Sequence, residues 1–248
     1  MSHPRIHETL KALFESKDKS LLGGLFSHAD FQAFALRIGS KLTAQEISSA
    51  FIHSSFSHEF GMKDQEVLEF LGDAVLGLVI TEKIVSLYPA LAEGKLSKMR
   101  SFLVNESSLS KLSRKLHLEE LIVLGKGEFM KKTNEQDAVL ADTFEALVAV
   151  LYKYEGLEFV RDFILNLFLT TNPEAFRMEN LESFDAKSKL QEWSLKKYKK
   201  LPVYKAEARG DEFLVELFID DKFISSDVFR SKKSGEKALA ENFLKNLK

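Results

Sequence analysis

Residues 66–80 have the sequence EVLEFLGDAVLGLVI. At about 100° per residue, the carboxylates of Glu66, Glu69 and Asp73 fall within an arc of about 60° on one helix. Nearly every other position is apolar, which is typical of a helix that is buried on most sides. The stretch therefore predicts a buried helix with one acidic stripe.

This acidic stripe has no local counter-charge, because no Lys or Arg occurs between Asp64 and Glu82. Clustered carboxylates that are partly desolvated are costly, or take up protons, unless a cation joins them. The stripe therefore indicates that a cation binds here.

A second acidic stretch, ADTFEA at residues 141–146, repeats the arrangement. On a helix, Asp142 and Glu145 share a face with small alanines, which let another helix approach closely. No basic residue occurs between Gln136 and Tyr152. If the two helices meet, they offer four or five carboxylates to a hard divalent ion, Mg²⁺ or Mn²⁺. The alternative is that these acids are capped, hydrogen-bonded or solvent-facing members of ordinary helices.

The surrounding sequence predicts an all-α domain over residues 29–169. Apolar residues recur there at spacings of three and four, and prolines are nearly absent. Residues 1–28 indicate only a short helix followed by a flexible segment around Gly23 and Gly24, so we assign this N-terminal extension no function. Residues 170–184 contain the turn signals Asn172 and Pro173 and are predicted to be a linker.

Residues 185–248 predict a small α+β domain of order α-β-β-β-α. Three β-type runs are separated by short polar breaks and flanked by helical segments. The expected elements are a helix at 186–198, strands at 203–208, 213–219 and 223–229, and a helix at 232–247.

Composition sets the protein class but does not point to a substrate. The 248 residues include 35 Lys and Arg, 37 Asp and Glu, and no Cys, which excludes disulfides and thiolate metal sites. The first residues lack the apolar core of a signal peptide, and no apolar run approaches the length of a membrane span. We therefore expect a soluble, cytoplasmic protein with no membrane partner.

Residues 68–76, LEFLGDAVL, resemble the signature of the ribonuclease III family. Residues 185–248 resemble a double-stranded-RNA-binding domain, with the runs KLQE, LPVY and SKK in the expected order. Further supporting residues of the first part are His53, Ser54, Glu93, Gly94, Gly125, Gly127, Glu128 and the motif Leu140-Ala141-Asp142 with Glu145. The resemblance covers residues 30–248 and implies a ribonuclease III endonuclease fold followed by the RNA-binding domain.

The resemblance also implies which carboxylates act. Glu69, Asp73, Asp142 and Glu145 correspond to the family's metal ligands, with Asp73 and Glu145 catalytic and Glu145 the most critical. Glu66 and Glu93 match secondary acids. The implied cofactor is Mg²⁺, with Mn²⁺ able to substitute, and no small-molecule cofactor is expected.

The implied activity is hydrolysis of double-stranded RNA by a homodimer. Products would carry 5′-phosphate and 3′-hydroxyl ends with a two-nucleotide 3′ overhang, and substrates would be precursor ribosomal, messenger and other structured RNAs. Phe70, Leu71 and Glu128 match interface residues, although core packing explains both apolar residues equally well. The alternatives are an inactive RNA-binding or ribosome-associated protein of the same fold, and an unrelated helical Mg²⁺ enzyme.

In the RNA-binding half, the resemblance implies contacts from Gln191 and Glu192 to 2′-hydroxyls and from Lys232 and Lys233 to phosphates. Both lysines also fit ordinary solvated charges at a helix end. The sequence departs from the family in a short loop near Gly210 that lacks a histidine. It also has Asp227 and Phe229 where glycines are usual, and Gly235 where alanine is usual.

Overall fold

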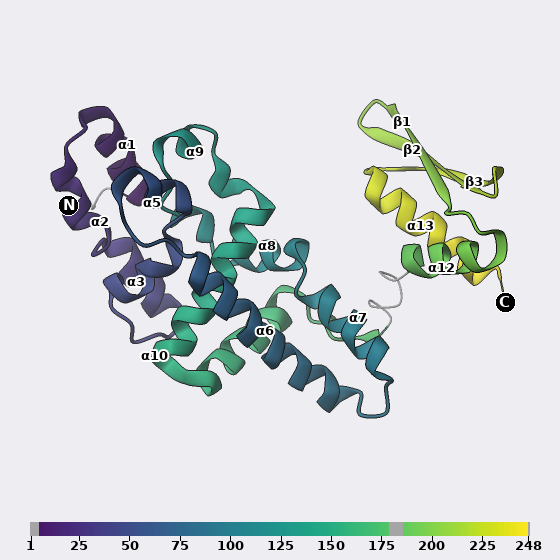
Figure 1. Ribbon diagram of the computed structural model, residues 1–248, viewed down its shortest axis with the longest axis horizontal. Coiled ribbons are helices and arrows are strands. Elements are labelled where there is room, and N and C mark those ends of the chain that lie inside the picture. Colours follow the sequence, from purple (N-terminus) through teal and green to yellow (C-terminus); the bar gives the residue numbers. More distant parts are fainter. Residues whose placement is uncertain (1–4, 179–185, 248) are drawn as a thin grey trace. The chain divides into compact units, whose positions relative to one another are not determined.

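The computed structural model describes residues 5–178 and 186–247, apart from the side chains of Ser188 and Lys233. The chain forms two compact units that divide between Ala175 and Phe176, and each is described separately (Figure 1). Within the described residues the first unit is helical, as predicted. Its α-helices are α1 (Ile6–Ser16), α2 (Leu22–Leu25), α3 (Ala29–Arg37), α4 (Ala44–Ser48), α5 (Ser54–Phe60), α6 (Glu66–Leu87), α7 (Glu93–Leu103), α8 (Glu106–Lys115), α9 (Lys126–Met130) and α10 (Asp137–Thr171). Short 3₁₀ turns are η1 (Lys19–Leu21), η2 (Ser49–Phe51), η3 (Leu118–Glu120) and η4 (Thr133–Glu135).

Helices α6 and α10 form the centre of this unit and make its most extensive contact between elements. Leu76 and Ile80 of α6 are fully buried, as are Leu147 and Leu151 of α10. The expectation that α6 is buried on most sides is only partly correct. One face leaves large apolar side chains exposed, namely Val67, Phe70 and Leu78.

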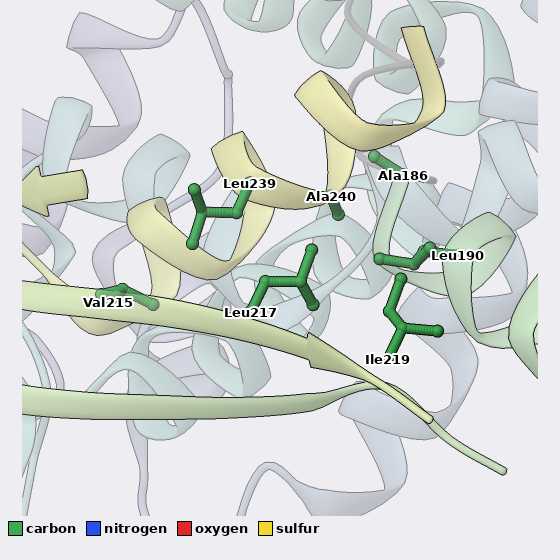
Figure 2. Packing of buried hydrophobic residues seen from close by; sticks show 7 residues of the cluster. All are labelled: Ala186, Leu190, Val215, Leu217, Ile219, Leu239 and Ala240. Carbon is green, nitrogen blue, oxygen red and sulfur yellow. The ribbon is translucent and has the colours of Figure 1, made fainter. Parts of the chain in front are cut away.

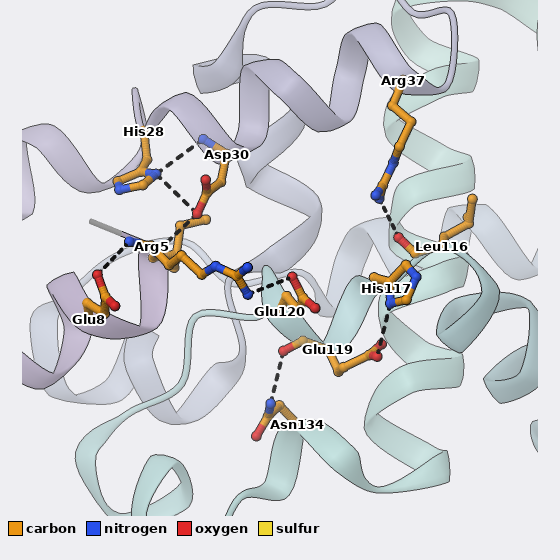
Figure 3. A network of polar contacts seen from close by, with 11 residues as sticks. Arg5, Glu8, His28, Asp30, Arg37, Leu116, His117, Glu119, Glu120 and Asn134 are labelled. Atoms are coloured by element: carbon orange, nitrogen blue, oxygen red, sulfur yellow. Dashed lines mark hydrogen bonds and ion pairs between the residues drawn. The ribbon is translucent and has the colours of Figure 1, made fainter. Parts of the chain in front are cut away.

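The N-terminal extension packs against the helical unit. Helix α1 buries Ile6, Leu10 and Leu13. The Ile6 N–H donates to Asp30 Oδ2 at 3.0 Å, and Arg5 lies 3.5 Å from Glu120, as Figure 3 shows for Arg5 and Glu120. Gly23 and Gly24 lie within α2, where we had expected a flexible segment.

The end of α10 falls just inside the predicted linker. The helix continues to Thr171, and Asn172 Oδ1 then accepts the Glu174 N–H at 3.1 Å. The following Phe176 is buried. Most of the expected linker, residues 179–184, lies outside the described part of the chain.

The second unit confirms the predicted order α-β-β-β-α. It consists of α12 (Ala186–Tyr198), β1 (Val203–Arg209), β2 (Glu212–Ile219), β3 (Lys222–Phe229) and α13 (Lys232–Lys245). The strands form an antiparallel sheet of order β1-β2-β3. Gly210 has φ 63° in the two-residue turn between β1 and β2, which confirms that this loop is short.

Alternate residues of β2 form the centre of this unit's core. Val215, Leu217 and Ile219 point to one face of the sheet, because side chains alternate along a strand. Both helices contribute to the same cluster, so they cover that face (Figure 2). The buried members are Ala186, Leu190, Val215, Leu217, Ile219, Leu239 and Ala240. Across the described ranges, no helix has the length and apolar character needed to cross a membrane.

Candidate metal centre

The structure brings together three of the four carboxylates predicted as metal ligands. Glu69 comes from the first turn of α6, and Asp142 and Glu145 come from α10. Each offers one oxygen, and these oxygens lie within 4.8 Å of one another. All three residues are half-buried. The acid-bearing helices therefore meet, and their acids converge.

A glycine permits this convergence. A Cβ atom added to Gly72 of α6 would lie only 1.8 Å from the backbone oxygen of Glu145 and 2.4 Å from its carbonyl carbon. Only glycine lets α6 approach the backbone of α10 so closely at this point. Because Glu69 precedes Gly72 by about one helical turn, the close approach brings its carboxylate toward those of α10.

The group is electrostatically unfavourable without a cation. Burial, together with the negative charges of Asp73, Glu69 and Asp142, raises the pKa of Glu145 to about 8. The pKa of Glu69 and that of Asp142 are also raised, in both cases mainly by burial. Among the described residues, no Lys or Arg forms an ion pair with Glu69, Asp142 or Glu145. The donor set therefore fits a hard divalent ion, which prefers carboxylate oxygens.

The fourth predicted ligand, Asp73, is exposed and does not belong to the close group. It acts on the group through its negative charge. After burial, the charge of Asp73 is the largest cause of the raised pKa of Glu145. Glu66 is also exposed and raises the pKa of Glu69. Glu93 is exposed at the start of α7, where it accepts a 2.8 Å hydrogen bond from Ser97 Oγ.

His53 lies at the N-terminus of helix α5. Its Nδ1 accepts the Ser55 N–H at 3.1 Å and caps that helix. Burial lowers the pKa of His53, although Glu128 and Asp142 oppose this shift through their negative charge. A neutral imidazole whose Nδ1 is an acceptor carries its proton on Nε2.

The three predicted interface residues differ in their surroundings. The Phe70 side chain is 81% exposed, whereas Leu71 is half-buried. Glu128 accepts hydrogen bonds from Lys131 Nζ at 2.8 Å and from Thr133 Oγ1. Of the three, only Phe70 presents a large apolar surface to solvent.

The predicted RNA-binding residues lie on the surface of the second unit. Gln191 and Glu192 are exposed on α12, and Lys232 is exposed at the start of α13. Lys232 Nζ lies 5.3 Å from the centre of the Phe213 ring. The side chain of Lys233 lies outside the described residues. Lys200, which lies shortly before β1, is paired with Asp221 at 2.6 Å and with Asp220 at 3.1 Å.

Two residues of the site were not identified from the sequence, namely Gly72 and Gln65. A glycine in the middle of a helix that is otherwise apolar is a signal of close backbone approach, so Gly72 could have been found. Gln65 is 3% exposed, and its Nε2 donates to Thr143 Oγ1 at 3.3 Å. No sequence pattern indicates that contact.

Comparison with known proteins agrees with the fold of both units. Residues 45–171 match the model of the family described as ribonuclease-III-like, and residues 186–247 match the double-stranded RNA binding motif. Ribonuclease 3 of Borreliella afzelii is 40% identical over 206 residues, which cover 80% of this chain and 83% of the relative. Ribonuclease 3 of Leptospira interrogans is 37% identical over 227 residues, which cover 88% and 90%.

A solved structure is similar to the helical unit. The nuclease domain of ribonuclease III from Campylobacter jejuni, described for structural flexibility in a region involved in dimer formation, has a TM-score of 0.55 and 31% identity. The similarity covers 58% of this chain and 99% of that one. It thus covers nearly the whole of that domain.

Proposed function

Because the chain belongs to the ribonuclease III family, we propose that it is an endoribonuclease that hydrolyses double-stranded RNA with Mg²⁺. The observation that carries this proposal is the convergence of Glu69, Asp142 and Glu145 within 4.8 Å. These ligands lie within the residues that match the nuclease model, in a chain that also carries the RNA-binding motif.

The carboxylates of the group would hold the ion, with Mn²⁺ able to substitute. Once bound, such an ion lowers the pKa of a water, orients it toward phosphorus and stabilises charge on the departing 3′ oxygen. Glu145 has a pKa of about 8 because it is partly buried among other acids. It must lose its proton to serve as a ligand. Asp73 would assist through its nearby negative charge, and we retain Asp73 and Glu145 as the proposed catalytic residues. The products would be 5′-phosphate and 3′-hydroxyl ends.

The proposed active form is a homodimer whose two sites cut opposite strands and leave a two-nucleotide 3′ overhang. The exposed apolar face of α6 supports this proposal, because Val67 is 64% and Phe70 81% exposed. Large apolar side chains that cluster on a surface mark contact sites with other proteins. The related Campylobacter jejuni domain is described in terms of dimer formation.

The second unit would hold the duplex by its shape and charge. The edges of the bases are hidden in the deep major groove of A-form RNA, so a duplex reader contacts 2′-hydroxyls and phosphates. Gln191 and Glu192 would meet the minor groove, and Lys232 and Lys233 would meet phosphates near the N-terminus of α13. Precursor ribosomal, messenger and other structured RNAs in the cytoplasm are the proposed substrates.

The test is incubation of the full chain with a labelled long RNA duplex, with and without Mg²⁺. We expect staggered cuts that require Mg²⁺, and a Glu145→Gln variant that binds the duplex but does not cut it. Glu15→Gln, at an exposed carboxylate of α1, is the charge-matched control and should cut normally.

Two results would contradict the proposal. Equal cutting by the Glu145→Gln variant would remove the assigned chemistry. Duplex binding by the parent chain without any cleavage would instead favour a non-catalytic RNA-binding protein of the same fold.

A further inference from the structure

One buried side chain connects the two helices that carry the metal ligands. Gln65 directly precedes α6, and its backbone carbonyl accepts the Glu69 N–H at 2.8 Å. Its side-chain Nε2 donates to Oγ1 of Thr143, at 3.3 Å. Thr143 directly follows Asp142 and lies two residues before Glu145 on α10. Gln65 is thus bonded to the ligand-bearing turns of both helices.

This contact is poorly explained by stability alone. Gln65 is 3% exposed, and its Oε1 is a buried acceptor with no partner among the described residues. A buried acceptor without a partner destabilises the fold. Thr143 does not require the contact, because its hydroxyl already donates to the Val139 carbonyl at 2.7 Å. A leucine at position 65 would fill similar space and leave no polar group newly unpaired.

We propose that Gln65 is a positioning residue of the metal centre, whose amide fixes the first turn of α6 against the Asp142–Glu145 turn of α10. The inference rests on the proposed function, since it concerns the same ion. Groups that orient metal ligands from outside the coordination shell typically change metal affinity by about 10- to 100-fold when they are replaced. We therefore expect the loss of this amide to weaken ion binding by about tenfold or more.

The experiment measures Mn²⁺ binding and urea unfolding of the full chain without RNA. Binding is followed by the loss of the free-ion electron paramagnetic resonance signal, and unfolding is measured in the presence of a chelator. Gln65→Leu should be at least as stable as the parent and should bind Mn²⁺ about tenfold more weakly. A role confined to structure would lower stability and leave the ion affinity unchanged.

Gln32 provides the matched control. Its amide bridges the Leu42 carbonyl, at 3.3 Å, and the Ala44 N–H, at 3.0 Å, within the same unit. Gln32→Leu leaves that N–H without its partner, so it should lower stability while Mn²⁺ binding stays at the parent value. Thr143→Val removes the other half of the Gln65 contact. The double variant with Gln65→Leu should bind Mn²⁺ no more weakly than either single variant.

The outcomes separate this inference from the proposed function. If Gln65→Leu binds Mn²⁺ as tightly as the parent, or if it loses stability as Gln32→Leu does with no specific loss of affinity, the positioning role is wrong and the nuclease assignment is unaffected. A parent chain that binds no Mn²⁺ would overturn both.

Discussion

Gly72 on α6 lies against the backbone of Glu145 on α10, so closely that a single methyl group at Gly72 would overlap the Glu145 carbonyl oxygen at 1.8 Å. Gly72 belongs to the LEFLGDAVL signature of residues 68–76. Glu145 has the most strongly raised pKa of the three converging carboxylates. The separation of the proposed metal ligands therefore depends on the absence of one Cβ atom.

Replacing this glycine should damage both stability and metal binding. Gly72→Ala must force α6 away from α10, because the overlapping atoms belong to the helix backbone and cannot move alone. We expect a loss of about 3 kcal/mol or more in the free energy of unfolding. Urea denaturation and Mn²⁺ titration would measure the two effects.

Gly77 on the same helix is the control. A Cβ atom at Gly77 would meet nothing within 4 Å, so Gly77→Ala should be neutral or stabilise the helix by up to about 1 kcal/mol. If Gly72→Ala behaved like Gly77→Ala, the close approach of α6 to α10 would not determine the geometry of the metal centre.

Stability of the metal-free protein should depend on pH through Glu145. Its folded pKa is about 8, against 4.5 for the ordinary group. Because the folded state binds this proton more tightly, the stabilisation is complete below about pH 4.5 and is lost as the pH rises through about 8. After allowance for solvent screening, we expect a loss of about 2 kcal/mol, measured by urea denaturation in chelator.

Glu145→Gln removes the titrating group, so its stability should change less over the same pH range. Saturating Mn²⁺ should also flatten the profile of the parent, since a bound cation takes the place of the proton. A parent whose stability rose between pH 5 and pH 8 would contradict the sign of this prediction.

The sequence predicted the acid-bearing helices because periodicity and charge are local properties. Glu69, Asp142 and Glu145 could be placed on helix faces from their spacing alone. Which acids converge depends instead on how α6 crosses α10, and that crossing is set by a contact between residues far apart in the chain. This is why Asp73 shared the predicted stripe with Glu69 and yet lies outside the close group.

Whether an apolar helix face is buried or exposed could not be predicted from local sequence either. The composition of α6 correctly indicated an apolar helix, but no local pattern distinguishes a face that packs within the chain from one left exposed, such as that of Phe70. In the second unit the order of helices and strands was predictable, because alternation and turn residues define short strands. The close packing of Phe229 against Gly235 could not be predicted, because it depends on how α13 lies against the sheet.

Asp73 should matter less for ion binding than the three converging acids. Asp73→Asn removes a charge that raises the pKa of Glu145 but leaves the oxygens of the close group in place. We expect Mn²⁺ affinity to fall by about tenfold, whereas Glu69→Gln should abolish measurable binding. Asp73→Asn should also lower the pKa of Glu145 and shift the stability profile toward lower pH. A loss as severe as in Glu69→Gln would make Asp73 a direct ligand.

Phe229 and Gly235 should behave as a coupled pair in the RNA-binding unit. A Cβ atom on Gly235 would lie 2.6 Å from Phe229 Cδ2 and 2.6 Å from Val215 Cγ2, so Gly235→Ala should cost about 1–3 kcal/mol. Phe229→Ala alone leaves a cavity, which the added methyl group partly fills in the double variant. We therefore expect the double variant to be more stable than the two single losses predict, by about 1 kcal/mol. Urea unfolding of all four proteins measures this difference, and additive losses would show that the two side chains do not share the space.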